Sequence, residues 1–141
     1  MIRLSKTPAA VLLIAVTLIA LAACSSAGNP LDGTQWKLAE WTISSIDPAA
    51  VTITATFADG RVSGNSGVNM YGGPYRIGPG KAFSAGPLAG TQMAGPEPAM
   101  RAESAYLTLL GQATSYKMAD GTLTLYDKGG NESLVFEASS K

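Results

Sequence analysis

The side chains that could carry out chemistry are few and scattered. The 141-residue chain has no histidine, one cysteine, and ten acidic residues balanced by ten basic ones. Without histidine, neither a Ser-His-Asp nor a Cys-His arrangement can form, and the common zinc ligand sets are missing. The acidic residues show no Asp-x-Asp or Glu-x-x-Glu grouping, and in order they are Asp32, Glu40, Asp47, Asp59, Glu97, Glu103, Asp120, Asp127, Glu132 and Glu137. We expect no enzyme activity, no cofactor and no metal, although a carboxylate pair that meets across the fold stays open.

The one cysteine, Cys24, follows a segment with the features of an export signal. Arg3 and Lys6 give residues 1–23 a positive start, and an apolar stretch from Ala9 to Ala22 follows. This stretch is shorter than the about 20 apolar residues that a membrane-spanning helix needs, so a cleaved secretory signal is our interpretation. The small residues before Cys24 resemble the lipobox of bacterial lipoproteins. That resemblance implies that Cys24 receives a diacylglycerol and becomes the new N-terminus.

Two alternatives stay open: an ordinary signal peptide cut after Ala23, and an uncleaved membrane anchor. In the lipoprotein interpretation, the protein is exported and anchored to the bacterial cell membrane, with its domain on the extracytoplasmic side. Residues 24–141 carry 8 basic and 10 acidic side chains, a net charge of −2. Anchoring would then depend on the acyl chains rather than on charge, and we expect no nucleic-acid binding.

The rest of the chain divides into a short linker and one domain. Residues 24–30 are small and polar, with Gly28 and Pro30 near their end, and predict a linker that reaches about 20 Å when extended. Residues 31–138 are of a size that can bury one hydrophobic core. We expect a monomer that lies close to the membrane surface.

The hydrophobic pattern of this domain predicts mostly β-structure. Apolar residues alternate with threonines from Val51 to Phe57, and Asp59-Gly60 is a strong hairpin signal. One amphipathic helix is predicted from Ala99 to about Thr114, with Glu103 assigned to its polar side. The predicted fold class is mainly β (α+β): a small antiparallel curled sheet or cracked barrel of about six to eight strands, with the helix packed on it.

A glycine-rich stretch between the predicted strands carries a family resemblance. From Val62 to Tyr75 the chain reads VSGNSGVNMYGGPY, and residues 91–96 read TQMAGP. The two blocks resemble the signatures of the META domain (HslJ-like) family, Gly-x-x-Gly-Cys-Asn-x-Tyr-x-Gly-x-Tyr and Thr-x-Met-Ala-Cys-Pro. The resemblance implies a small cracked barrel with one helix. Some similar lipoproteins are linked to heat shock, antibiotic tolerance or motility without an assigned mechanism.

Both positions that are usually cysteine in this family are replaced here, by Val68 and Gly95. Loss of both would make sense if the two cysteines commonly contact each other. We therefore predict that Val68 and Gly95 are neighbours in space, held by contacts rather than by a covalent bond.

Three residues match the family motif and form the candidate binding set: Asn69, Tyr71 and Tyr75. Their structural interpretation has Asn69 bonding its own loop and the tyrosines closing the core. In the functional interpretation, the tyrosines and Trp36 or Trp41 line a mouth that takes an apolar ligand. The sequence thus favours a non-enzymatic envelope protein with a stress, structural or interaction role, partnered by another envelope protein. The alternative is a binding module for a lipid or a small apolar molecule.

Overall fold

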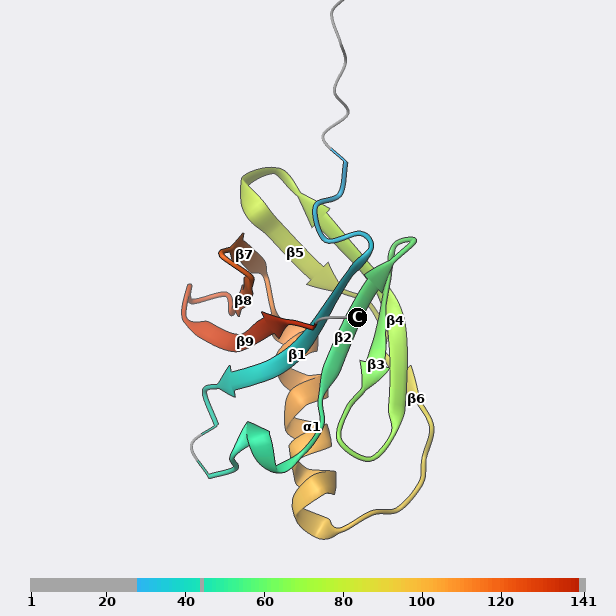
Figure 1. Cartoon of the computed structure of the whole chain (residues 1–141). Helices are drawn as coiled ribbons and strands as arrows, with labels where there is room; N and C mark the ends of the chain where they lie inside the picture. The colour runs from blue at the N-terminus through green and yellow to red at the C-terminus, as the bar shows by residue number, and fades with distance from the viewer. Residues whose placement is uncertain (1–27, 44, 140–141) are drawn as a thin grey trace, which may run out of the picture.

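The computed structural model describes residues 28–43 and 45–139 (Figure 1). The predicted signal segment and the predicted lipid attachment site, Cys24, lie outside the described residues. The elements in chain order are β1 (Thr34–Trp41), η1 (Pro48–Ala50), β2 (Thr54–Ala58), β3 (Arg61–Asn65), β4 (Met70–Gly78), η2 (Pro79–Lys81), β5 (Ala82–Ala85), β6 (Ala89–Gly90), α1 (Glu97–Gln112), β7 (Ser115–Ala119), β8 (Thr122–Tyr126) and β9 (Glu132–Ala138), where η marks a short 3-10 helix.

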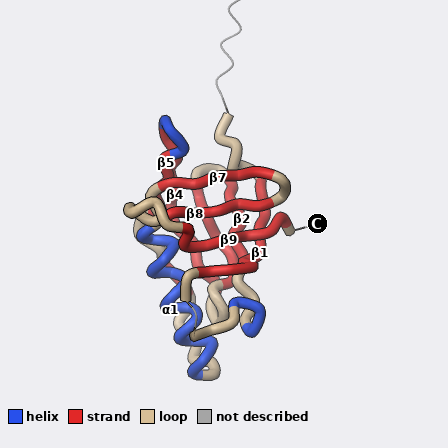
Figure 2. Tube along the Cα trace, turned by 90° about the vertical axis from the view of Figure 1, so that its left-hand side faces the viewer, coloured by secondary structure: helices blue, strands red, loops and turns tan. Residues whose placement is uncertain are grey.

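Eight of these strands form a closed antiparallel barrel. Around the barrel the order is β1, β2, β3, β4, β5, β7, β8 and β9, and pairing between β9 and β1 completes the circle. Figure 2 shows β7, β8, β9 and β1 side by side on one face. The two-residue strand β6 pairs with the start of β4. The predicted fold class is confirmed, since the structure is mainly β with one helix packed on the barrel.

The barrel is weakest where β5 meets β7. The only Cα partners between these two strands are Ala82 and Ser115. One further backbone hydrogen bond runs from the Phe83 amide to the Thr114 carbonyl, at 2.9 Å. This seam is the crack of the predicted cracked barrel.

Two tight turns have the backbone that their sequences predict. Asp59 and Gly60 join β2 to β3 with φ values of 52° and 73°, and Asp120 and Gly121 join β7 to β8 with values of 52° and 74°. Glycine adopts positive φ without steric cost and aspartate tolerates it, so these pairs suit two-residue hairpins.

The barrel interior is filled by side chains. Strand residues that point inward are buried, such as Ala55 and Phe57 of β2, and α1 adds Tyr106 and Leu110, which are both fully buried. Phe57 and Phe136 are also completely buried, and Tyr106 packs edge-on against Phe136. The space enclosed by the strands is therefore a packed core.

The glycine-rich stretch lies mostly in strands, because β3 and the nine-residue β4 together take up most of it. A side chain at Gly73 would place its Cβ 2.5 Å from the Pro87 carbonyl oxygen, and one at Gly64 would collide with the Thr54 carbonyl. These glycines let another backbone pass close by while the strand continues.

Helix α1 begins and ends two residues earlier than predicted. Pro98 is tolerated in its first turn, because the first amides of a helix have no partner inside the helix. The helix ends at Gln112 because Ala113 has extended backbone, with φ −64° and ψ 136°.

The two ends of the barrel are covered differently. At one end, which we call the helix-covered end, the loop Ser66–Asn69 between β3 and β4 lies against the first half of α1. At the other, which we call the open end, β1 begins, β9 ends and the described chain starts at Gly28 (Figure 1). The motif residues are divided between these two ends.

Candidate functional site

Tyr71 is buried at the centre of the motif. Its hydroxyl lies 2.6 Å from the Tyr106 hydroxyl and donates to the Thr54 carbonyl at 2.9 Å, and only 4% of the residue is exposed. Burial raises the pKa of Tyr71 well above its ordinary value, so the hydroxyl stays neutral at any physiological pH. Tyr71 therefore links β4 to α1 inside the core.

Tyr75 lies further along β4, near the open end. Its ring packs edge-on against Phe57 and stacks near Phe83, and its hydroxyl accepts a hydrogen bond from the Asn29 side-chain amide at 2.6 Å. Burial raises the pKa of Tyr75 above its ordinary value. Tyr75 thus fastens the segment that leads into β1.

Asn69 bonds its own loop, as predicted, but through its backbone carbonyl, which accepts from the Ser66 amide and from the Ser66 hydroxyl, each at 2.8 Å. Its side chain bonds other segments. The side-chain oxygen accepts from the Met93 amide at 2.7 Å and from the Thr91 hydroxyl at 2.9 Å. The side-chain nitrogen donates to Glu103 at 2.8 Å and to the Met93 carbonyl at 3.2 Å. Asn69 therefore ties the first family block to the second block and to α1, because both segments pass within reach of one amide.

Glu103 is the central residue of this network and was missed from sequence. Its carboxylate accepts from the Ser66 hydroxyl at 2.5 Å and from the backbone and side-chain nitrogens of Asn69, each at 2.8 Å. Burial alone would raise the pKa of the Glu103 carboxyl, but these hydrogen bonds together outweigh burial and hold the pKa below its ordinary value. The helical spacing could have revealed it, because Ala99, Glu103, Tyr106 and Leu110 lie on one stripe.

The predicted contact between Val68 and Gly95 is confirmed. A Cβ built on Gly95 would lie 3.4 Å from the Val68 Cβ and 2.8 Å from its Cγ2. The valine side chain therefore fills the space that a side chain at position 95 would occupy. The two family blocks pack directly against each other, and Asn69 joins them by hydrogen bonds beside this contact.

The polar groups of this network are all paired with one another. Among the described residues, no buried side-chain nitrogen or oxygen lacks a hydrogen-bond partner. No three acidic side chains gather into a potential metal site in the same part of the chain. An arrangement in which the buried acceptors and donors satisfy one another can hold segments together.

Two hollows lie at the open end instead. One, of about 550 Å³, has walls that include Pro30, Ile77, Lys81 and Tyr116, and we call it the lysine hollow. The other, of about 490 Å³, is bordered by Gln35, Trp36, Met118 and Ala138. Both volumes fall in the range of small-molecule sites.

The aromatic residues that were predicted to line one ligand-binding mouth lie in separate places. Trp36 is 4% exposed, so it belongs to the core, and its ring nitrogen donates to the Thr34 hydroxyl at 2.8 Å. Trp41 lies at the other end of β1 and donates to the Ile46 carbonyl at 2.8 Å. Neither tryptophan shares a hollow with Tyr71, so the four aromatic residues do not line one mouth.

The fold and the site define a small, closed antiparallel β-barrel in which one helix is fastened to the strands by a buried glutamate and a glycine-rich hairpin. The sequence matches the profile of the META domain family over residues 29–140, so the chain belongs to this family.

Solved structures show the same fold. The chain is similar to a protein from Burkholderia xenovorans solved by NMR, with 31% identity, a TM-score of 0.65, and coverage of 79% of this chain and 85% of that one. It also resembles a DUF4847 family protein from Bacteroides vulgatus at 12% identity and a TM-score of 0.57, over 79% and 96% of the two chains.

No curated protein matches the sequence. No helix in the described ranges is long and apolar enough to span a membrane.

Proposed function

We propose that this protein is a membrane-anchored envelope lipoprotein whose META domain has a non-enzymatic structural or interaction role. The observation that carries the proposal is the position of Cys24, which follows Leu21-Ala22-Ala23 and precedes the first barrel contact by only five residues. That contact is the hydrogen bond between Asn29 and Tyr75. A lipid on Cys24 would hold the barrel at the membrane by a very short tether.

The bonding of the motif residues supports a role other than catalysis. Ser66, Asn69 and Glu103 satisfy one another, and Tyr71 is paired with Tyr106. A catalytic site would keep at least one such group free for substrate, in a concave position. Here the same residues are used to join two segments and a helix.

A second candidate function, binding of a lipid or small apolar molecule, is favoured by the two hollows at the open end. Their volumes of about 550 and 490 Å³ exceed the about 300 Å³ below which ligand sites are rare. The packed interior offers no space of its own, so binding would occur at the mouth of the barrel. This candidate places the site away from Asn69 and Tyr71.

The anchor is tested by replacing Cys24 with serine and fractionating the cells. We expect the wild-type protein in the membrane fraction and labelled by a fatty acid analogue, and the Cys24→Ser variant unlabelled and released. A matched Ser25→Ala variant should behave like wild type. Equal membrane association of wild type and Cys24→Ser would refute the lipoprotein proposal.

The role is tested by deleting the gene and exposing cells to heat and to envelope-active antibiotics. We expect sensitivity that the wild-type gene restores and the Cys24→Ser gene does not. Restoration by the released variant would show that the role does not need the anchor.

A further inference from the structure

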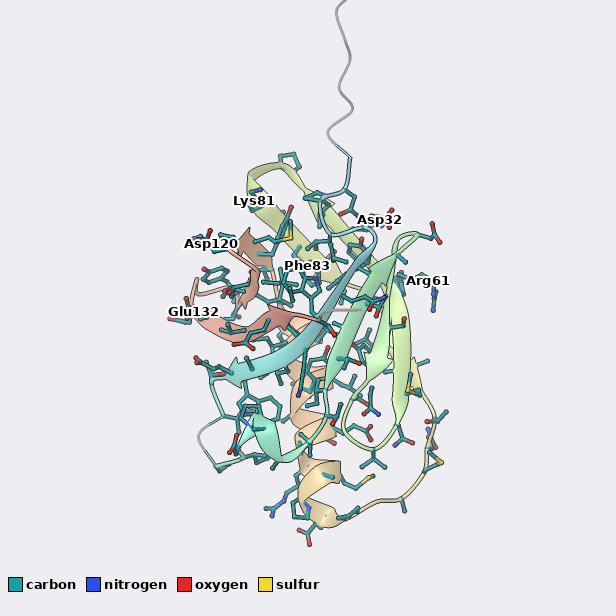
Figure 3. All side chains as sticks on the ribbon, viewed as in Figure 1. Asp32, Arg61, Lys81, Phe83, Asp120 and Glu132 are labelled. Carbon is teal, nitrogen blue, oxygen red and sulfur yellow. The ribbon has the colours of Figure 1, made fainter. Side chains whose placement is uncertain are left out.

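The lysine hollow has walls suited to an amphiphile. Pro30, Ile77 and the ring of Tyr116 supply apolar surface, and Lys81 supplies a single positive charge. Figure 3 shows Lys81 and Asp32 at the same end of the barrel, beside the start of the described chain. A ligand that fits these walls has a short apolar part next to an anionic group.

Lys81 is available to such an anion. Its ammonium lies 5.4 Å from the centre of the Tyr116 ring, a cation–π contact that holds the charge over the hollow. The only ion pair within 4 Å among the described residues joins Arg101 to Glu97 on α1, so no carboxylate there neutralises Lys81. The Asp32 carboxylate, at the same end of the barrel, accepts from the Asp59 amide at 2.7 Å.

The backbone at Lys81 is also unusual for its residue type. Three residues other than glycine have positive φ in the described chain: Asp59, Lys81 and Asp120. The two aspartates are common in such turns, but lysine is not, and at 63° it carries a steric cost that glycine or asparagine would avoid. This backbone places Lys81 in the tight turn between β4 and β5, where its side chain borders the hollow.

The tether brings this hollow to the membrane, a step that depends on the proposed lipidation of Cys24. Gly28, which borders the hollow, is four positions after Cys24 in the chain. At roughly 3.5 Å per residue, the anchor lies within about 14 Å of Gly28. The hollow is therefore held at the level of the lipid headgroups.

We propose that the lysine hollow binds the headgroup of an anionic membrane phospholipid, with the phosphate at Lys81 and the glycerol and first methylenes against Pro30, Ile77 and Tyr116. The diacylglycerol on Cys24 itself has no phosphate, so the unpaired charge of Lys81 favours a neighbouring lipid over the protein's own anchor. One lysine near a membrane attracts an anionic headgroup only weakly. The tether compensates, because it keeps lipid at a high effective concentration beside the hollow.

The binding test uses the mature protein, both lipidated and as Cys24→Ser, in a neutral detergent. Dihexanoyl phosphatidylglycerol, kept below its micelle concentration, is added while NMR follows the signals of Ile77, Lys81 and Tyr116. We expect saturable shifts confined to these residues. Dihexanoyl phosphatidylcholine, whose choline offsets the phosphate charge, should bind at least about fivefold more weakly.

Charge variants then separate this site from general attraction. Lys81→Glu should weaken binding at least about tenfold, because it places like charges together. Lys117→Glu, the same change at an exposed lysine beside Asp120 and Glu132, should change it less than about twofold. Lys81→Asn suits the positive φ and provides a second test if the glutamate variant does not fold.

Three results would overturn the proposal: no saturable shift, equal weakening by Lys81→Glu and Lys117→Glu, or equal affinity for the two lipids. Signals of the hollow that already differ between the lipidated and Cys24→Ser proteins before lipid is added would instead assign the hollow to the protein's own acyl chain. Failure of the anchor is distinguished by fractionation, since Lys81→Glu should remain in the membrane fraction while Cys24→Ser leaves it.

Discussion

The helix-covered end and the open end of the barrel use polar residues in opposite ways. At the helix-covered end, Glu103, Asn69 and Ser66 are buried and satisfy one another. At the open end, Lys81 and Met118 are exposed beside hollows, and no carboxylate pairs with the lysine within the described residues. The motif residues therefore hold the fold together, Asn69 and Tyr71 beside the helix and Tyr75 near the open end, while the exposed Lys81 and Met118 lie outside the motif.

The largest effect should come from the core of the helix-covered end. Leu110 is fully buried on α1, so Leu110→Ala should lower the free energy of unfolding by about 2 to 5 kcal/mol through lost burial and a cavity. Urea denaturation measures this loss. The exposed Thr108→Ala on the same helix should stay within about 0.5 kcal/mol. A similar small loss for Leu110→Ala would mean that this face of the helix does not support the core.

A covalent link between the two family blocks should be the next largest effect. The Cβ separation of 3.4 Å between Val68 and a side chain at Gly95 is close to that of a disulfide, and Gly95 does not have positive φ. Val68→Cys with Gly95→Cys should form a bridge and stabilise the protein by up to about 3 to 4 kcal/mol, less any strain. Thermal melting with and without reductant tests this, with each single variant as control. Two free thiols under oxidising conditions would show that the blocks are not held in this geometry.

The buried glutamate should make the helix-covered end sensitive to acid. Because folding lowers the pKa of Glu103 below its ordinary value of 4.5, its contribution is complete above that pH and is lost as the pH falls through the folded pKa. Glu103→Gln should cost about 1 to 3 kcal/mol at pH 7, since the new amide faces the Asn69 side-chain donor. The gap to wild type should narrow between pH 5 and pH 3 in urea titrations.

The exposed Glu97→Gln serves as the control for this pH dependence, because its carboxylate meets only Arg101 at 3.8 Å. A constant gap between wild type and Glu103→Gln over the whole pH range would show that the glutamate is not held ionised in the folded protein.

The smallest effect should come from the open end. Tyr75→Phe removes the hydroxyl that accepts from Asn29 but keeps the ring against Phe57, so the loss should be about 0.5 to 1.5 kcal/mol. Hydrogen exchange should increase at Leu31, whose amide donates to the Asn29 side chain. Unchanged exchange at Leu31 would mean that the segment leading into β1 is held by the burial of Leu31 alone. The hydrogen bond at the open end would then contribute little to holding the fold.

Local chemistry explains which features could be predicted from sequence. Asp59-Gly60 and Asp120-Gly121 determine their own turns, and the alternation around Ile53 to Phe57 determines which face is buried. The contact between Val68 and Gly95 was predicted only because the family resemblance identified two positions that are usually cysteine and that are both replaced here.

Glu103 was assigned to solvent because a carboxylate on a helix usually lies there. Its partners are 34 and 37 residues away in the chain, and only the folded barrel brings them within reach. The lysine hollow was equally hidden, since its walls come from the start of the domain, the turn after β4, and β7. Helical spacing can show that Glu103 faces the core, but it does not show which distant residues bond it.

The pairing of β1 with β9 affects how the barrel can form. Most neighbouring strands follow each other closely in the chain and can pair as hairpins, but Trp36 and Ala138 are partners across more than a hundred residues. Closing so long a loop is entropically costly, and it cannot begin before the last strand is available. In a chain that is made available N-terminus first, one edge of β1 therefore stays unpaired until β9 is present. Pairing of β9 with β1 is the step that closes the barrel.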